Sequence, residues 1–126
     1  MEWSFIEKGN AAGADFEIAA EWVGEDLLIC IRGGGKPHIG CSVQAVFRPS
    51  LSGDGSASAT ASVWNLTGHK DEFICRPAAE RLCALTGRTV VCTGGFHSDG
   101  LTKEQIKEVL WEIKAAVERL ARRLCE

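Results

Sequence analysis

The sequence predicts an α+β domain, with two helices packed on one side of an antiparallel, meander-based sheet of about five to six strands. Two observations predict it. Apolar and polar residues alternate with the period of a strand through most of the first half, and apolar residues recur at helical spacing near the C-terminus. At 126 residues, 45% of them hydrophobic, the chain has the size and composition of a single domain over residues 1–126.

Short alternating segments define the expected strands. Residues 1–13 carry Trp3, Phe5 and Ile6 ahead of turn residues, which predicts a short edge strand. The other expected strands cover residues 14–23, 27–31, 41–48, 56–66 and 88–96. The third and last of these six segments are apolar on both faces, which is typical of strands in the interior of a sheet.

The two helices have recognisable ends. Asp71 is a plausible N-cap for a helix through about Leu85 that stops at Gly87. Because of Pro77 we expect a loose first turn at 71–75 and a regular helix from about 76. Thr102 and Gln105 have the spacing of a capping box, so the second helix is expected from 103. Its apolar stripe consists of Ile106, Val109, Leu110, Ile113, Val117, Leu120 and Leu124.

Charge and cysteine content limit the partners and the compartment. A net charge of -3 and a pI near 5.6 argue against a nucleic acid or an anionic membrane as partner. No apolar run has the length of a signal peptide core or a membrane span. The six cysteines form no Cys-x-x-Cys pair and mostly follow the apolar patterns. We therefore expect a cytoplasmic protein with reduced, buried thiols.

Every histidine of the chain lies in a glycine-flanked break between apolar segments. The candidate ligand-binding residues of these three breaks are Gly34, Gly35, Lys36, Pro37, His38 and Gly40, then Gly68, His69 and Lys70, and finally Gly95, His97 and Asp99. If consecutive strands and helices run in alternating directions, all three breaks meet at the same edge of the sheet, together with the N-termini of both helices. Glycine-rich turns and helix N-termini attract anions, so this edge predicts a phosphate-bearing ligand.

Other interpretations of these residues remain open. His38, His69 and His97 are an alternative set of ligands for a metal such as zinc, which would make the protein a small metal-dependent hydrolase or decarboxylase. A further alternative is a homodimeric assembly factor without a ligand. The glycine loop does not match a P-loop, since no Gly-Lys-Ser or Gly-Lys-Thr follows. A Cys41–His38 nucleophile pair is disfavoured, because Cys41 is in phase with the core face of its strand.

Three segments, 34–40, 68–71 and 94–102, together resemble the prenylated-flavin chaperone-like family, which includes the small D-type subunit encoded with gallate decarboxylase. The resemblance spans about residues 14 to 120. It implies a fold like that of proteasome assembly chaperones and a non-catalytic accessory protein of a UbiD-type decarboxylase. Such a protein would hold or deliver prenylated FMN, or FMN. We also expect the chain to form a homo-oligomer. The residues that match the family's motifs are Pro37, His38, Gly40, Gly68, His69, Lys70, His97 and Asp99.

Overall fold

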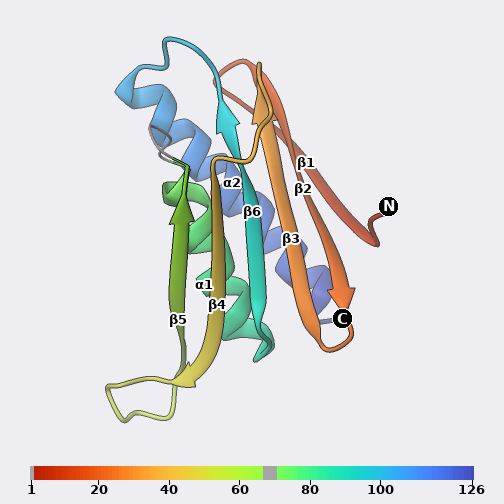
Figure 1. The fold of residues 1–126 in the computed structure, drawn as a ribbon, viewed down its shortest axis with the longest axis vertical. Helices are drawn as coiled ribbons and strands as arrows, with labels where there is room; N and C mark the ends of the chain where they lie inside the picture. The colour runs from red at the N-terminus through yellow and green to blue at the C-terminus, as the bar shows by residue number, and fades with distance from the viewer. Residues whose placement is uncertain (1, 67–70) are drawn as a thin grey trace.

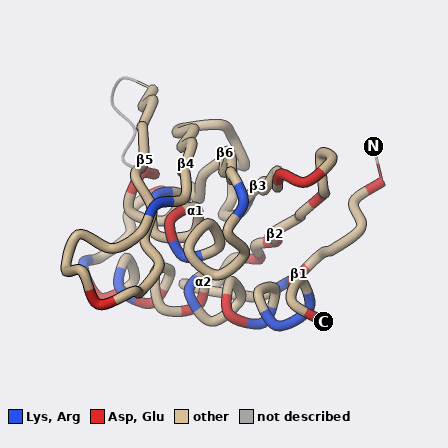
Figure 2. The backbone as a smooth tube through the Cα atoms, turned by 90° about the horizontal axis from the view of Figure 1, so that it is seen from below, with Lys and Arg blue, Asp and Glu red and all other residues tan. Residues whose placement is uncertain are grey.

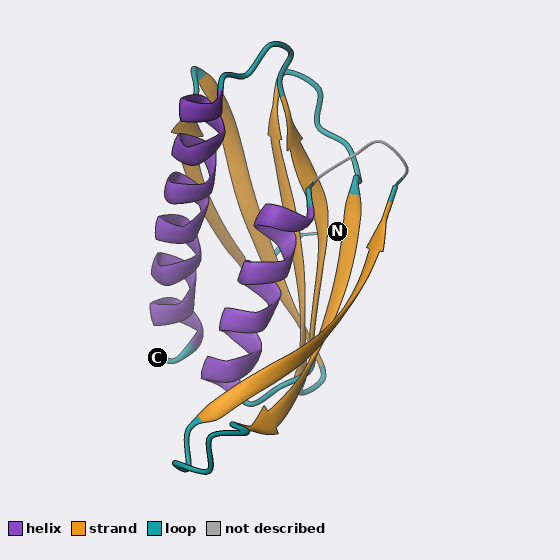
Figure 3. Ribbon diagram, turned by 90° about the vertical axis from the view of Figure 1, so that its left-hand side faces the viewer, coloured by secondary structure: helices purple, strands orange, loops and turns teal. Residues whose placement is uncertain are grey.

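The computed structural model describes residues 2–66 and 71–126. The elements are β1 (Phe5–Ala11), β2 (Ala14–Val23), β3 (Asp26–Gly34), β4 (Cys41–Pro49), β5 (Ala57–Asn65), α1 (Glu72–Thr86), β6 (Val90–His97) and α2 (Lys103–Leu124). The six strands form one sheet in the order β1-β2-β3-β6-β4-β5 (Figure 1). Both helices lie on the same face of this sheet (Figure 3). The predicted α+β class, the six strands and the one-sided placement of the helices are confirmed.

The predicted meander is wrong at the centre of the sheet. β3 and β4 do not pair, because β6 lies between them, parallel to β3 and antiparallel to β4. β6 carries Val90, Val91 and Cys92 in a row, and a strand that is apolar on both faces is most stable between two neighbours. Strands are about 4.8 Å apart, so the residues between β3 and β4 easily cross the width of one intervening strand. The sheet is therefore mixed.

Helix α1 begins earlier than the sequence predicts. It is regular from Glu72, and Pro77 lies inside it. Since the N–H groups of the first turn have no partner within the helix in any case, a proline in the second turn removes only one further hydrogen bond. The expected loose turn at 71–75 is therefore absent. The predicted end is confirmed, because Gly87 adopts a left-handed conformation with φ 71° and donates to the carbonyl oxygen of Cys83.

Helix α2 begins where the capping box predicts. Thr102 N–H donates to Oε1 of Gln105 at 2.9 Å, and Gln105 N–H donates to Oγ1 of Thr102 at 3.1 Å. The apolar stripe faces the sheet, although Ile106 at its start is 41% exposed. The buried residues of α2 are Val109, Ile113, Ala116, Val117, Leu120 and Ala121. Near its C-terminal end, which lies beside β1 in Figure 2, Arg119 and Arg123 bind Glu7.

All six cysteines are unpaired thiols. Cys41, Cys75, Cys83 and Cys92 are buried, Cys30 is half-buried and Cys125 is exposed. Their distribution agrees with the expectation of reduced, largely buried thiols. None of the helices in the described ranges has the length and apolarity required to cross a membrane.

Candidate functional site

The first and third glycine breaks lie side by side at one end of the sheet. Strands β3 and β6 both finish there and β4 starts there (Figure 1), with Gly34 opposite His97 in the parallel register. The imidazole rings of His38 and His97 meet edge to face, with centroids 5.6 Å apart and an interplanar angle of 89°. The predicted convergence is thus confirmed for these two histidines. The other candidates, Gly68, His69 and Lys70, lie outside the described residues.

Backbone contacts close the two breaks against each other. Lys36 N–H donates to the carbonyl oxygen of His97 at 3.3 Å, and Gly40 N–H donates to that of Gly94 at 2.9 Å. The N–H of Leu66, the residue after β5, donates to the carbonyl oxygen of Gly40 at 2.9 Å. We call this region the loop edge and define it as residues 34–40, 66, 71 and 94–99. Its conformation is set by hydrogen bonds between segments that are far apart in the sequence.

Two glycines of the loop edge allow chain segments to approach closely. Gly34 has φ 84°, and a Cβ atom there would lie 2.0 Å from the carbonyl oxygen of His97. A Cβ atom at Gly40 would lie 1.9 Å from Oδ2 of Asp71. Gly35, by contrast, has no atom within 4 Å of such a Cβ position. Gly34 and Gly40 are therefore required by the fold itself.

Asp71 is the central residue of the loop edge. Among the described residues it is the single polar or charged residue that is buried, with 4% exposure. Its Oδ1 accepts a hydrogen bond from the N–H of Phe96 at 3.0 Å, and its Oδ2 lies 3.0 Å from Nε2 of His38. Both Gly40 and Gly95 pack against this carboxylate. One side chain therefore joins the start of α1, the loop after β3 and the end of β6.

The sequence interpretation assigned Asp71 a different role. It stands at the N-cap position as predicted, but its side chain makes no capping hydrogen bond and its backbone is helical, with φ -73° and ψ -3°. The available signal was the position of Asp71, two residues after His69 in a glycine-flanked break. An aspartate before a helix is so commonly a cap that this position alone does not indicate a buried ion pair.

Both ring nitrogens of His38 lie beside oxygen atoms. Nδ1 lies 3.1 Å from the carbonyl oxygen of Lys36, and Nε2 lies 3.0 Å from the Asp71 carboxylate. A carbonyl oxygen and an ionised carboxylate only accept hydrogen bonds, so both contacts are satisfied together when both ring nitrogens carry a proton. This arrangement suits an imidazolium paired with a buried carboxylate.

The third break adds a partly exposed group of charges. Nε2 of His97 lies 3.1 Å from Oδ1 of Asp99, and Nζ of Lys36 lies 4.0 Å from Oδ2 of the same carboxylate. Gly35 N–H donates to Oγ of Ser98 at 3.2 Å. Lys36 and Asp99 are both exposed, so their pairing is weak and a ligand can compete for either group.

Two cavities at the loop edge share Pro37 as a lining residue. One has a volume of about 280 Å³ and is lined by Lys36, Pro37, His38, Ile39, Leu66 and His97. The other, of about 540 Å³, is lined by Lys8, Gly9, Asp15, Phe16, Glu17, Arg32, Gly33, Gly34 and Pro37. Ile39 and Leu66 are 65% and 54% exposed, and the sequence patterns did not identify them as part of the site. The smaller cavity thus combines imidazoles and one ammonium group with apolar walls.

The loop edge offers little support for a metal or for a cysteine nucleophile. Within residues 2–66 and 71–126, no cluster of three potential ligand side chains is arranged to hold a metal ion. Both ring nitrogens of His38 already face oxygen atoms, and His69 lies outside the described residues. Burial, followed by the neighbouring Cys75, raises the pKa of Cys41 to about 12, so this thiol stays protonated at neutral pH.

The fold is that of a proteasome assembly chaperone. A solved chaperone complex for yeast 20S proteasome assembly contains a chain that matches with a TM-score of 0.53 and 14% sequence identity, over 94% of this chain and 98% of that one. This likeness concerns the fold alone.

The sequence comparisons define the family. Residues 10–125 match the prenylated flavin chaperone LpdD-like domain. The chain is also 32% identical over 101 residues to protein LpdD of Lactiplantibacillus plantarum, an alignment that covers 75% of this chain and 66% of that protein. The chain therefore belongs to the prenylated flavin chaperone LpdD-like family, as the three motifs indicate.

Proposed function

We propose that the protein is an accessory chaperone of a UbiD-type decarboxylase of aromatic acids and that it holds or delivers prenylated FMN at the loop edge. Membership of the prenylated flavin chaperone LpdD-like family supports the accessory role and the type of cofactor. The proposed location is supported by the convergence of His38 and His97, whose ring centroids are 5.6 Å apart, beside a cavity of about 280 Å³. The protein itself has no catalytic residue in this proposal.

The loop edge has groups suited to both parts of a flavin mononucleotide. Lys36 provides positive charge for the phosphate, and the partly exposed ring of His97 can donate a hydrogen bond to it. Pro37, Ile39 and Leu66 provide an apolar wall for the ring system. The cavity beside His38 lies below the usual size of a complete ligand pocket, so we assign it to one part of the cofactor. The rest would extend across Pro37 into the larger cavity.

The helix N-termini contribute less than the sequence interpretation assumes. Asp71 and Glu72 already place negative charge at the start of α1. The capping box of α2 uses the N–H of Gln105 for Thr102. We therefore assign the phosphate to Lys36 and His97, with Gly68, His69 and Lys70 as proposed further ligands.

A titration tests this site directly. Purified protein is titrated with prenylated FMN and with FMN, and binding is followed by flavin fluorescence and calorimetry. We expect micromolar affinity for prenylated FMN and a loss of about tenfold or more in His97→Ala and in Lys36→Ala, since each removes a contact to the ligand. Lys107→Ala, on the exposed side of α2, is the matched control and should bind like the wild type. Absence of binding at micromolar concentrations would contradict the proposal.

The delivery function needs a second measurement. Apo decarboxylase of the UbiD type is mixed with prenylated FMN in the presence or absence of this protein, and the rate of activation is recorded. We expect faster or more complete activation with the wild-type chain, and a smaller effect with His97→Ala. Equal activation by the wild type and the variant would show that the chaperone activity does not depend on the loop edge.

A second candidate function is a homodimeric assembly factor that needs no ligand. It is favoured by the sheet face opposite the helices, which no element of the described chain covers (Figure 3). Trp64 and Val46 lie on this face and are 80% and 50% exposed. Sedimentation of the wild type and of Trp64→Ser tests it. A dimer that Trp64→Ser dissociates, together with unchanged decarboxylase activation by His38→Ala and His97→Ala, would favour this function.

A further inference from the structure

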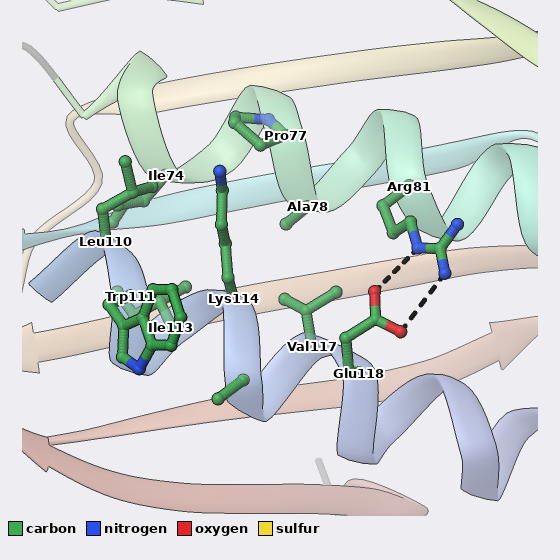
Figure 4. Close-up of a pocket in the computed structure, with 11 residues that line it drawn as sticks. Ile74, Pro77, Ala78, Arg81, Leu110, Trp111, Ile113, Lys114, Val117 and Glu118 are labelled. Carbon is green, nitrogen blue, oxygen red and sulfur yellow. Dashed lines mark hydrogen bonds and ion pairs between the residues drawn. The ribbon is translucent and has the colours of Figure 1, made fainter.

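A separate groove lies between the two helices, on their side away from the sheet. It has a volume of about 380 Å³, and none of its lining residues borders the cavities at the loop edge. Figure 4 shows it between α1, which contributes Pro77 and Ala78, and α2, which contributes Trp111 and Val117. Almost all of its exposed lining is apolar, and its volume is in the range of ordinary small-molecule sites.

One end of the groove is closed by an ion pair. Nε of Arg81 donates to Oε1 of Glu118 at 2.7 Å, and Nη2 of Arg81 is 3.3 Å from Oε2. The hydrogen bond from Arg81 holds the pKa of Glu118 below its ordinary value, and the same bond raises the pKa of Arg81. The one carboxylate that lines the groove is thus ionised and already bound.

The other charged residue of the groove is Lys114. Its side chain extends from α2 toward Pro77 on the opposite helix (Figure 4). No ion pair of the described residues involves Lys114. Two other cations of α2 are paired, Lys107 with Glu104 of the same helix and Arg119 with Glu7 of β1. Lys114 is exposed, so an anion that enters the groove can reach its ammonium group.

The indole of Trp111 forms a wall of the groove and is 74% exposed. This indole is in contact with water in the free protein. A ligand that covers it removes apolar area from water, which favours binding by about 25 cal/mol per Å². Trp111 and Lys114 are three residues apart on α2, and neighbours at this spacing share a face of a helix. The groove therefore joins an apolar wall to an uncompensated positive charge.

We propose that this groove binds a small organic anion with an apolar body, of the alkyl or aryl monocarboxylate class. The apolar body lies against Trp111, Ala78 and Val117, and the carboxylate pairs with Lys114. A ligand cation does not fit this arrangement, since Glu118 is neutralised by Arg81. The proposal is independent of flavin binding at the loop edge, because the two sites have no residue in common.

Decanoate and decanol are the probes that test it. Calorimetric titration of the full-length protein should show saturable binding of decanoate in the submillimolar range and clearly weaker binding of decanol, which lacks the charge. Lys114→Met keeps the length of the side chain and removes the ammonium group, so it should weaken decanoate about tenfold and leave decanol unchanged. Trp111→Ala should weaken both probes.

Lys107→Met is the matched control, since Lys107 is an exposed lysine of α2 outside the groove. It should bind decanoate like the wild type. The proposal is overturned if decanoate does not saturate, if decanol binds equally well, or if Lys107→Met and Lys114→Met weaken binding to the same extent. The first of these outcomes would leave the groove as a surface for a protein partner.

Discussion

The buried carboxylate of Asp71 lies 3.0 Å from Nε2 of His38, although the two residues are 33 positions apart in the sequence. The same carboxylate accepts a hydrogen bond from the N–H of Phe96. Because Asp71 opens α1, His38 follows β3 and Phe96 belongs to β6, this contact fixes the relative positions of three elements. The geometry of the loop edge and the stability of the protein are therefore linked.

Removing either partner of this pair should destabilise the fold. His38→Ala leaves a buried carboxylate without its counter-charge, and Asp71→Ala also leaves the N–H of Phe96 unsatisfied. We expect each variant to lower the free energy of unfolding by about 3 kcal/mol, and the double variant to lose much less than the sum. Urea unfolding of the four proteins measures this coupling.

The exposed pair of His97 and Asp99 is the matched control. Its side chains are 40% and 79% exposed, so water already solvates both groups. Asp99→Ala should therefore change the free energy of unfolding by only about 0.5 kcal/mol or less. If Asp99→Ala costs as much as Asp71→Ala, the buried pair has no special role in stability.

A second prediction concerns two glycines of the same loop. Gly40→Ala places a methyl group 1.9 Å from Oδ2 of Asp71, whereas Gly35→Ala meets no atom within 4 Å. The backbone or the carboxylate must shift in the first variant, at a cost of about 2 kcal/mol or more. We expect Gly40→Ala to melt at a lower temperature than the wild type, and Gly35→Ala to melt at nearly the same temperature as the wild type. Equal melting temperatures would show that the loop adapts without strain.

The edge at which the loops meet was predictable, and the neighbours of each strand were not. Alternating chain directions place the ends of β3 and β6 together whatever the order of strands in the sheet, which is why His38 and His97 were expected to converge. Strand order depends on which strand gains most from burial on both sides. Periodicity identifies β6 as such a strand but does not state that it enters between β3 and β4.

The sequence patterns that predict helix α2 are local, whereas the site depends on residues far apart in the chain. The capping box at Thr102 and the apolar stripe are encoded within a few residues, so the start of α2 was predicted to the residue. The role of Asp71 depends on Gly40 and Gly95, which give room for its carboxylate from distant parts of the chain. No local pattern contains that information, and the same holds for Ile39 and Leu66 in the cavity wall.

The thiols should differ strongly in reactivity. Burial raises the pKa of Cys83, and burial together with Cys75 raises the pKa of Cys41 to about 12, whereas Cys125 is exposed. In the native protein at about pH 8, a disulfide reagent such as DTNB should modify Cys125 first, with Cys30 slower. The remaining thiols should react only after unfolding in guanidinium chloride. Cys125→Ser should abolish the fast phase, and a fast phase that persists would contradict this assignment.

The last prediction concerns the contact of α2 with β1. Burial pushes the pKa of Glu7 upward, but hydrogen bonds from Arg123 and Arg119 outweigh burial and hold this pKa below its ordinary value of 4.5. A lowered folded-state pKa means that the unfolded chain binds the proton more readily as the pH falls. Glu7 should therefore stabilise the fold at neutral pH, by about 1 kcal/mol, and lose this contribution in acid as the pH falls through the folded-state pKa.

Urea unfolding of the wild type and of Glu7→Gln checks this sign. The difference in the free energy of unfolding should be largest at neutral pH and should shrink at a pH well below the ordinary carboxyl range, because the wild-type side chain is then protonated and resembles glutamine. Glu25→Gln removes the exposed contact with Arg88 and serves as control, with little effect at either pH. A difference for Glu7→Gln that stays constant across this range would show that packing, and not charge, holds α2 on β1.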